Sequence, residues 1–217
     1  MIVPKMTKAE ILKEIDRDSD WVLDRQPGIW KKYAKKIARA KYGTTLLGQT
    51  RYTTERKNNI WVLWMCEKWK DETGIYSLMM HEVMSPRGYE YIVAIEHETL
   101  GSTTITFTPH AIDRLKERSG MDFPELTRYC ATKRGGYLCI TTYEYEGEKR
   151  PVYSLGEFGL FVLSDGPWGF IAQTYVNKDL LSDAQTRTLE KDAEEKKLFR
   201  RPKHNNVNFF HPALKVR

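Results

Sequence analysis

The sequence predicts an α+β fold, in which helices, among them a central helix at 109–118, accompany antiparallel β-sheet. Two observations predict this class. Segments rich in aromatic and β-branched residues recur with turn-forming residues between them, which is typical of antiparallel strands. Segments with apolar residues three and four positions apart precede and interrupt these strands, which is typical of amphipathic helices.

Composition narrows the class of protein. A chain of 217 residues with 41% hydrophobic residues can bury a core and form one compact domain or two small ones. The net charge of +6 favours a polyanionic partner such as RNA or another nucleic acid. Cys66, Cys130 and Cys139 lack metal-type spacing, so we expect reduced thiols, no metal and no cofactor. No apolar run approaches the ~20 residues that span a bilayer, and we expect a cytoplasmic protein without a membrane partner.

Residues 1–100, the first region, are predicted to form two helices and then a β-meander. Thr7 stands three residues before Glu10, a capping box that begins a short helix. A second helix is predicted at 28–43, with Gly43 at its C-terminal end. Its apolar stripe comprises Trp30, Tyr33, Ala34, Ile37 and Ala38. The predicted strands of the meander are 59–69, 75–84 and 89–97, and alternation along the second of them puts His81 and Glu82 on opposite faces.

Residues 101–180, the second region, are predicted to form a β-sheet and one helix, whose ends are marked by capping residues. Thr108 suits the N-cap, Pro109 the first helical position and Gly120 the end of the helix. Segment 102–108 predicts either a fourth strand or a lead-in to this helix. Further strands are predicted at 137–146, 151–155, 159–164 and 169–176. The last region, 181–217, predicts a C-terminal helix from a capping box at 182–185 to about residue 199, followed by a basic tail.

The central helix carries a basic triplet beside its apolar face. Ala111, Ile112 and Leu115 should face the core, and His110, Arg114 and Arg118 lie on the neighbouring arc. The positive end of the helix attracts phosphate and disfavours a charged imidazole, so a neutral histidine there could act as a base. Two guanidinium groups could grip phosphate oxygens. These groups suffice for metal-free RNA cleavage, in which the 2′-hydroxyl attacks the adjacent phosphate. The alternative is a structural helix, in which Asp113 and Glu117 pair with the arginines.

The stretch HAIDRLKER, residues 110–118, resembles the HAxxRxxER helix of small toxin-like proteins in the barnase/colicin/RelE-like ribonuclease superfamily. The resemblance covers residues 105–178 and implies that the central helix at 109–118 packs on a four-stranded antiparallel sheet. It also implies a bacterial or phage protein that acts in the host cytoplasm or belongs to a virion. It implies that His110 is the base or acid and that Arg114 and Arg118 hold the phosphate. Thr174 or Tyr175, on the last strand, would position the phosphate or the leaving group, and an antitoxin would be a protein partner. The chain departs from the family in the ~100 residues before the motif and in having one histidine there.

A second basic feature is the polar side of the helix at 28–43. Its cations and those of the tail predict contacts with nucleic acid through Lys31, Lys32, Lys35, Lys36, Arg39, Arg200 and Arg201. The alternative is a solvated helix face. The sequence therefore predicts a metal-independent endoribonuclease of toxin type. The alternatives are a non-catalytic nucleic-acid-binding or phage virion-associated protein with a degenerate ribonuclease-like domain, and an interaction protein without a polyanionic ligand.

Overall fold

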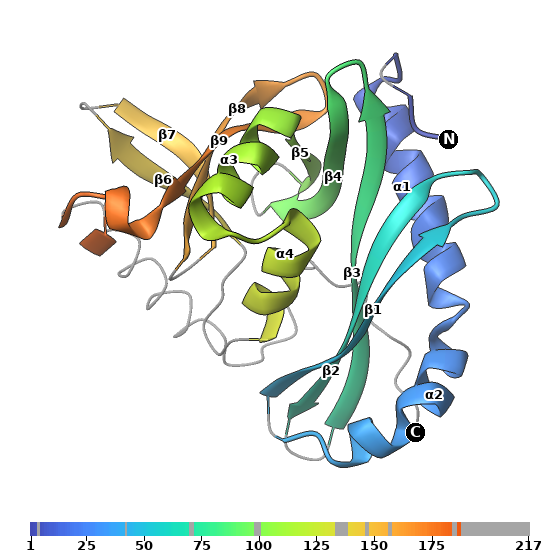
Figure 1. The fold of residues 1–217 in the computed structure, drawn as a ribbon. Helices are drawn as coiled ribbons and strands as arrows, with labels where there is room; N and C mark the ends of the chain where they lie inside the picture. The colour runs from blue at the N-terminus through green and yellow to red at the C-terminus, as the bar shows by residue number, and fades with distance from the viewer. Residues whose placement is uncertain are drawn as a thin grey trace. The chain divides into compact units, whose positions relative to one another are not determined.

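The computed structural model describes residues 1–3, 5–41, 43–69, 72–97, 101–132, 139–145, 148–155, 158–183 and 186–187 (Figure 1). The chain divides into two compact units between Thr104 and Ile105. Most of the helix predicted from residue 182 to about residue 199 lies outside the described residues, which end at Arg187. Arg200 and Arg201 of the basic tail lie outside them too. No helix in the described part of the chain is long and apolar enough to cross a bilayer.

The first unit begins with two helices, followed by long strands. The elements are α1 (Lys8–Leu23), α2 (Gln26–Ala38), β1 (Gly43–Thr53), β2 (Asn59–Trp69), β3 (Glu72–Ser85) and β4 (Gly88–His97). The next strand, β5 (Gly101–Phe107), spans the boundary between the units. The second unit continues with α3 (Pro109–Ser119), α4 (Phe123–Thr132), β6 (Cys139–Tyr145), β7 (Glu148–Ser154), β8 (Gly159–Gly166), β9 (Gly169–Asn177) and a 3₁₀ helix (Lys178–Leu180).

The predicted four-stranded sheet with a central helix is wrong. The described strands form a nine-stranded sheet in the order β1-β2-β3-β4-β5-β9-β8-β7-β6. Strand β9 therefore has a hydrogen-bonded neighbour on each side, β8 and β5, and is not the edge of a separate small sheet. Periodicity identifies a strand, but it does not say which strands pair, because pairing is decided by contacts distant in sequence. The coarser prediction, an α+β fold, is confirmed.

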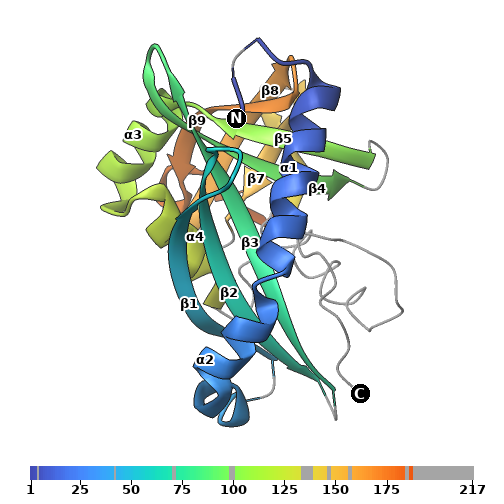
Figure 2. The same cartoon turned by 90° about the vertical axis from the view of Figure 1, so that its right-hand side faces the viewer.

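In the first unit, α1 and α2 cover one face of the strands β1 to β3 (Figure 2). The core between these layers contains Val22 from α1, Ile29 and Ile37 from α2, and Ile60 and Trp64 from β2. Strand alternation explains this composition, because every second residue of β2 faces the helices. Burying such side chains stabilises the layer by about 1.5–3 kcal/mol each.

The first helix begins as the sequence predicts, whereas both ends of the second helix differ from the prediction. The capping box is confirmed, because the Thr7 hydroxyl accepts from the Glu10 N–H and the Glu10 carboxylate accepts from the Thr7 N–H. Helix α2 starts earlier than predicted and ends at Ala38, so Gly43 does not cap it. Gly43 instead starts β1 with φ of 101°, a conformation that favours glycine. The apolar stripe is also shifted, since Ala34 and Ala38 are exposed while Ile29 is buried.

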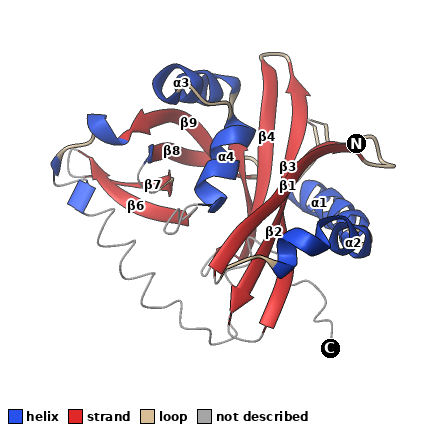
Figure 3. Ribbon diagram, turned by 60° about the horizontal axis from the view of Figure 1, so that its bottom comes forward, coloured by secondary structure: helices blue, strands red, loops and turns tan. Residues whose placement is uncertain are grey.

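In the second unit, α3 packs on β9 (Figure 3). An aromatic core lies in this unit. The ring centroid of Phe107 is 4.2 Å from that of Phe123 and 4.9 Å from that of Phe161. The ring of Tyr175 from β9 lies 5.3 Å from that of Phe161. Offset and edge-to-face aromatic pairs of this kind add stability beyond the area that they bury. Segment 102–108 is strand β5 up to Phe107, and Thr108 caps α3. The helix α4 was not predicted.

Candidate nucleic-acid interface

Helix α3 has the ends that its sequence predicts. The Thr108 hydroxyl accepts from the N–H of Ala111 at 3.2 Å and donates to the carbonyl of Ala172 on β9 at 3.0 Å. Pro109 occupies the first turn, and Gly120 ends the helix with φ of 71°. The threonine therefore caps the helix and also ties it to the sheet.

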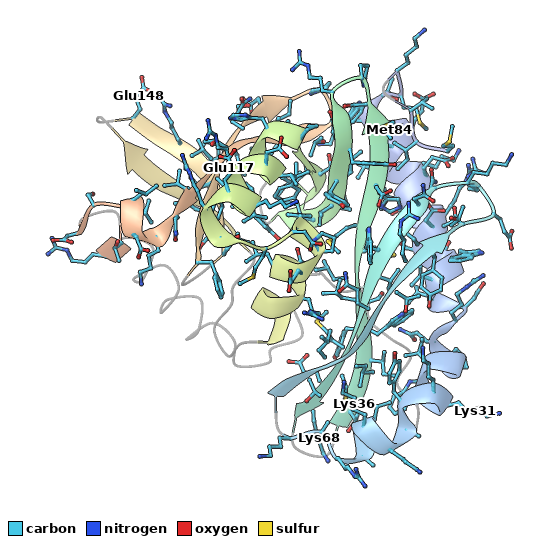
Figure 4. The ribbon with its side chains drawn as sticks, in the orientation of Figure 1. Lys31, Lys36, Lys68, Met84, Glu117 and Glu148 are labelled. Carbon is cyan, nitrogen blue, oxygen red and sulfur yellow. The ribbon has the colours of Figure 1, made fainter. Side chains whose placement is uncertain are left out.

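The basic triplet of α3 is exposed. A side-chain nitrogen of Arg114 lies 2.8 Å from a carboxylate oxygen of Glu117, which Figure 4 labels on α3. Arg118 donates to the backbone carbonyl of Tyr175. His110 makes no hydrogen bond or ion pair with the residues that the structure describes. The exposed Arg114–Glu117 pair contributes little to stability, because water screens it.

The two predicted residues of β9 have different surroundings. Tyr175 is fully buried, and its hydroxyl donates to the carbonyl of Phe158 at 2.5 Å. Thr174 is half-buried. The hydroxyl of Tyr175 is therefore engaged inside the aromatic core, while Thr174 keeps partial access to solvent.

A basic pocket lies at the C-terminal end of α2. Its volume is about 460 Å³, and it is lined by Lys35, Lys36, Arg39, Ala40, Lys41 and Thr45. Of the six lining residues that the structure describes, four are cationic and none is acidic. We call this concavity the basic pocket. It brings three of the predicted nucleic-acid-binding residues together with Lys41 and Thr45.

Local structure explains why the cations gather there. Ile37 and Ala40 are buried against the sheet, so the residues between and around them turn outward. The ammonium of Lys36 donates to the backbone carbonyl of Leu47 on β1 at 3.0 Å, which fixes this side chain across the helix–strand junction. The carbonyl groups at the end of a helix also favour nearby cations.

Lys31 and Lys32 lie one helical turn before the basic pocket. Both are exposed and neither lines it. The ammonium of Lys32 lies 5.1 Å from the ring centroid of Tyr33. In Figure 4, Lys31 points away from the strands, while Lys36 lies toward them. The predicted basic helix face is exposed throughout, and it is divided into a part that lines the basic pocket and a part that lies outside it.

Other ionisable groups of the first unit have structural partners. His81 and Glu82 lie on opposite faces of β3, as predicted: His81 is within 3.1 Å of Asp18 from α1, and Glu82 accepts two hydrogen bonds from Arg51. Cys66 is a buried free thiol, and its burial raises the pKa of the thiol. These contacts join α1 to β3 and β1 to β3.

No family model, curated protein or solved structure matches the chain. The two basic features, on α2 and on α3, are therefore the candidate sites. Sequence reasoning missed Thr45 because it missed β1, whose polar segment GTTLLGQTRYT lacks a clear alternation of apolar residues. Lys41 fell within the predicted helix, but α2 ends at Ala38, and Lys41 lines the pocket together with Arg39.

Proposed function

We propose that the protein binds nucleic acid through the basic pocket and the adjoining exposed lysines of α2. The observation that carries the proposal is the described lining of the pocket, in which four residues are cationic and none is acidic. Lysine and arginine side chains that neutralise backbone phosphates release condensed counterions, and this release drives binding largely independently of sequence. A solvated helix face, which is the alternative, does not require its cations to line a depression.

The proposal is supported by the way in which the cations are held. Lys36 is oriented by its hydrogen bond to Leu47, so less side-chain entropy is lost when it meets a phosphate. Arg39 offers a planar fork of donors, which suits two phosphate oxygens at once. The exposed Lys31 and Lys32 extend the positive surface along α2 beyond the pocket.

A binding assay tests this function. We expect a fluorescently labelled single-stranded RNA to bind the wild type at low salt and to bind Lys35→Ala/Arg39→Ala at least about tenfold more weakly, because two phosphate contacts are lost. The matched control is Lys5→Ala/Lys13→Ala, which removes two exposed cations near and on α1. Equal loss of affinity in both double variants would contradict a localised site.

A second candidate function is the metal-independent endoribonuclease on α3. The observation that favours it is the exposed His110, which has no hydrogen-bond partner among the described residues and lies one and two helical turns from the exposed Arg114 and Arg118. Arg114 can exchange its weak pair with Glu117 for a phosphate. Thr174 pairs with Val162 and alternates with Tyr175, so its side chain lies on the face of β9 opposite the aromatic core and does not join this site. In this proposal the buried Tyr175 supports the site through its backbone carbonyl, which holds Arg118.

The ribonuclease proposal makes its own prediction. Wild-type protein should cleave a labelled mixed-sequence RNA in EDTA and leave 2′,3′-cyclic phosphate ends. His110→Ala should lower the cleavage rate by about 10² or more, while Lys116→Ala, an exposed cation of the same helix, should leave it unchanged. Full recovery of intact RNA from the wild type would reject this activity and leave the binding proposal standing.

A further inference from the structure

We infer that the basic pocket receives a terminal phosphate monoester of the bound nucleic acid, so that the protein prefers strands with a phosphorylated end. This inference rests on the proposed binding function and adds to it the part of the ligand that the pocket recognises. It follows from the charge of the pocket, the way its cations are held and the position of the remaining lysines.

The charge of the pocket exceeds what one internal phosphate requires. A phosphodiester within a strand carries one negative charge, whereas a terminal monoester carries about −1.5 to −2 near pH 7 and has three acceptor oxygens. Lys35, Lys36, Arg39 and Lys41 line one open depression of about 460 Å³, and none of the described residues that line it is acidic. Such a concentration of cations at one place complements a doubly charged group better than a singly charged one.

The donors of the pocket also suit a terminal group. Lys36 keeps further ammonium hydrogens for a ligand after bonding to Leu47, and Thr45 adds a hydroxyl from the strand side. Arg39 can hold two oxygens of one phosphate through its planar fork. Donors from both the helix and β1 can therefore approach several oxygens of one phosphate, which a monoester exposes more fully than a backbone diester.

The exposed lysines give the bound strand a direction. Lys31, Lys35 and Arg39 recur every four residues, so they form a stripe about 12 Å long on α2 that ends at the pocket. A strand whose phosphorylated end lies in the pocket can continue along this stripe toward the N-terminus of α2. The pocket would then read the end, and Lys31 would contact the backbone.

Oligonucleotides with different ends test the inference. We would measure, by fluorescence anisotropy at fixed salt, the affinities of one internally labelled RNA sequence with a 5′-phosphate, with a 3′-phosphate, or with hydroxyls at both ends. The wild type should bind one phosphorylated form about tenfold more tightly than the form with two hydroxyls, because several charge-assisted hydrogen bonds are added. Whichever form gains identifies the end that enters the pocket. A hydroxyl-ended RNA that is one nucleotide longer controls for the added charge.

Two single variants separate recognition of the terminal phosphate from binding of the RNA backbone. Lys41→Ala, which changes the pocket outside α2, should abolish the end preference. Lys31→Ala, which changes the stripe outside the pocket, should weaken all three RNAs equally and keep the preference. Equal affinities of the three RNAs for the wild type, or a preference that survives Lys41→Ala, would overturn the inference while the binding function stands. Absence of RNA binding altogether would overturn the proposed function and the inference with it.

Discussion

The carboxylate of Glu14 on α1 is nearly buried and accepts two hydrogen bonds from Arg56, one of them at 2.6 Å. Burial alone would raise the pKa of a carboxyl group, because the charged form loses its hydration. Here the hydrogen bonds from Arg56 outweigh burial and lower the pKa of Glu14 from 4.5 to about 2. One residue thus ties α1 to the turn between β1 and β2.

This pKa has a consequence for stability. Because the folded-state pKa lies below the ordinary value, the Glu14 carboxylate stabilises the fold above pH 4.5, and this contribution is lost as pH falls toward 2. We expect about 1 to 3 kcal/mol at neutral pH, less than the full shift implies, because water screens the half-exposed Arg56.

Urea denaturation at a series of pH values checks this expectation. Glu14→Gln should be less stable than the wild type at pH 7, and the difference should shrink between pH 4.5 and pH 2. The control is Glu117→Gln, which removes an exposed pair with Arg114 and should cost about 0.5 kcal/mol or less. A Glu14→Gln deficit that is constant with pH would contradict the role of the charged form.

Residue-scale prediction succeeded where the signal was local. Alternation along β3 predicted that His81 and Glu82 face opposite ways, and their partners confirm it. The identity of the partners could not be predicted, since Asp18 is 63 residues from His81 in sequence. Only packing of α1 on the sheet brings this histidine and aspartate together.

At the scale of elements, α3 shows how a cap fixes a helix and its position at once. Thr108 satisfies a free N–H of the first turn and also donates to the carbonyl of Ala172 on β9. Its local sequence, with Pro109 after it and Gly120 at the other end, was sufficient to predict the helix. The bond to β9 could not be predicted, because it depends on the packing of α3.

Replacement of this cap tests the element. Thr108→Ala should destabilise the protein by about 1 to 2 kcal/mol, because both hydrogen bonds of the hydroxyl are lost. Thr108→Ser retains a hydroxyl that can make both bonds and should cost about 0.5 kcal/mol or less. The measurement is the urea midpoint at pH 7, and an equal loss in the two variants would show that the methyl group, not the hydroxyl, is responsible.

Other elements were predicted less well for identifiable reasons. The strands β2, β3 and β4 have strong aromatic and β-branched composition and were found from it. Strand β1 was missed because its composition is polar and includes Gly48. The glycine is needed there, since a side chain at this position would collide with the hydroxyl of Tyr33. Without β1, the sequence could not place Thr45 or Leu47 beside the end of α2.

At the scale of the whole molecule, the net charge of +6 could be predicted from the sequence, but its concentration could not. The basic pocket arises where buried Ile37 and Ala40 leave the cations around them facing outward, and Lys41, which follows the end of α2, lines it as well. The strand order could not be predicted either, because the sheet has nine strands and not four. The proposed binding function depends on this local concentration of charge and not on the total charge.

The salt dependence of RNA binding tests the central claim most directly. For single strands, the logarithm of the binding constant falls with the logarithm of salt concentration by about 0.7 per phosphate contacted. We predict a slope of roughly −2 to −3 for the wild type, a slope smaller in magnitude by roughly 1.4 for Lys35→Ala/Arg39→Ala, and the wild-type slope for Lys5→Ala/Lys13→Ala. A wild-type affinity that does not change with salt, or a slope unaffected by loss of the two pocket cations, would contradict binding of nucleic acid at the basic pocket.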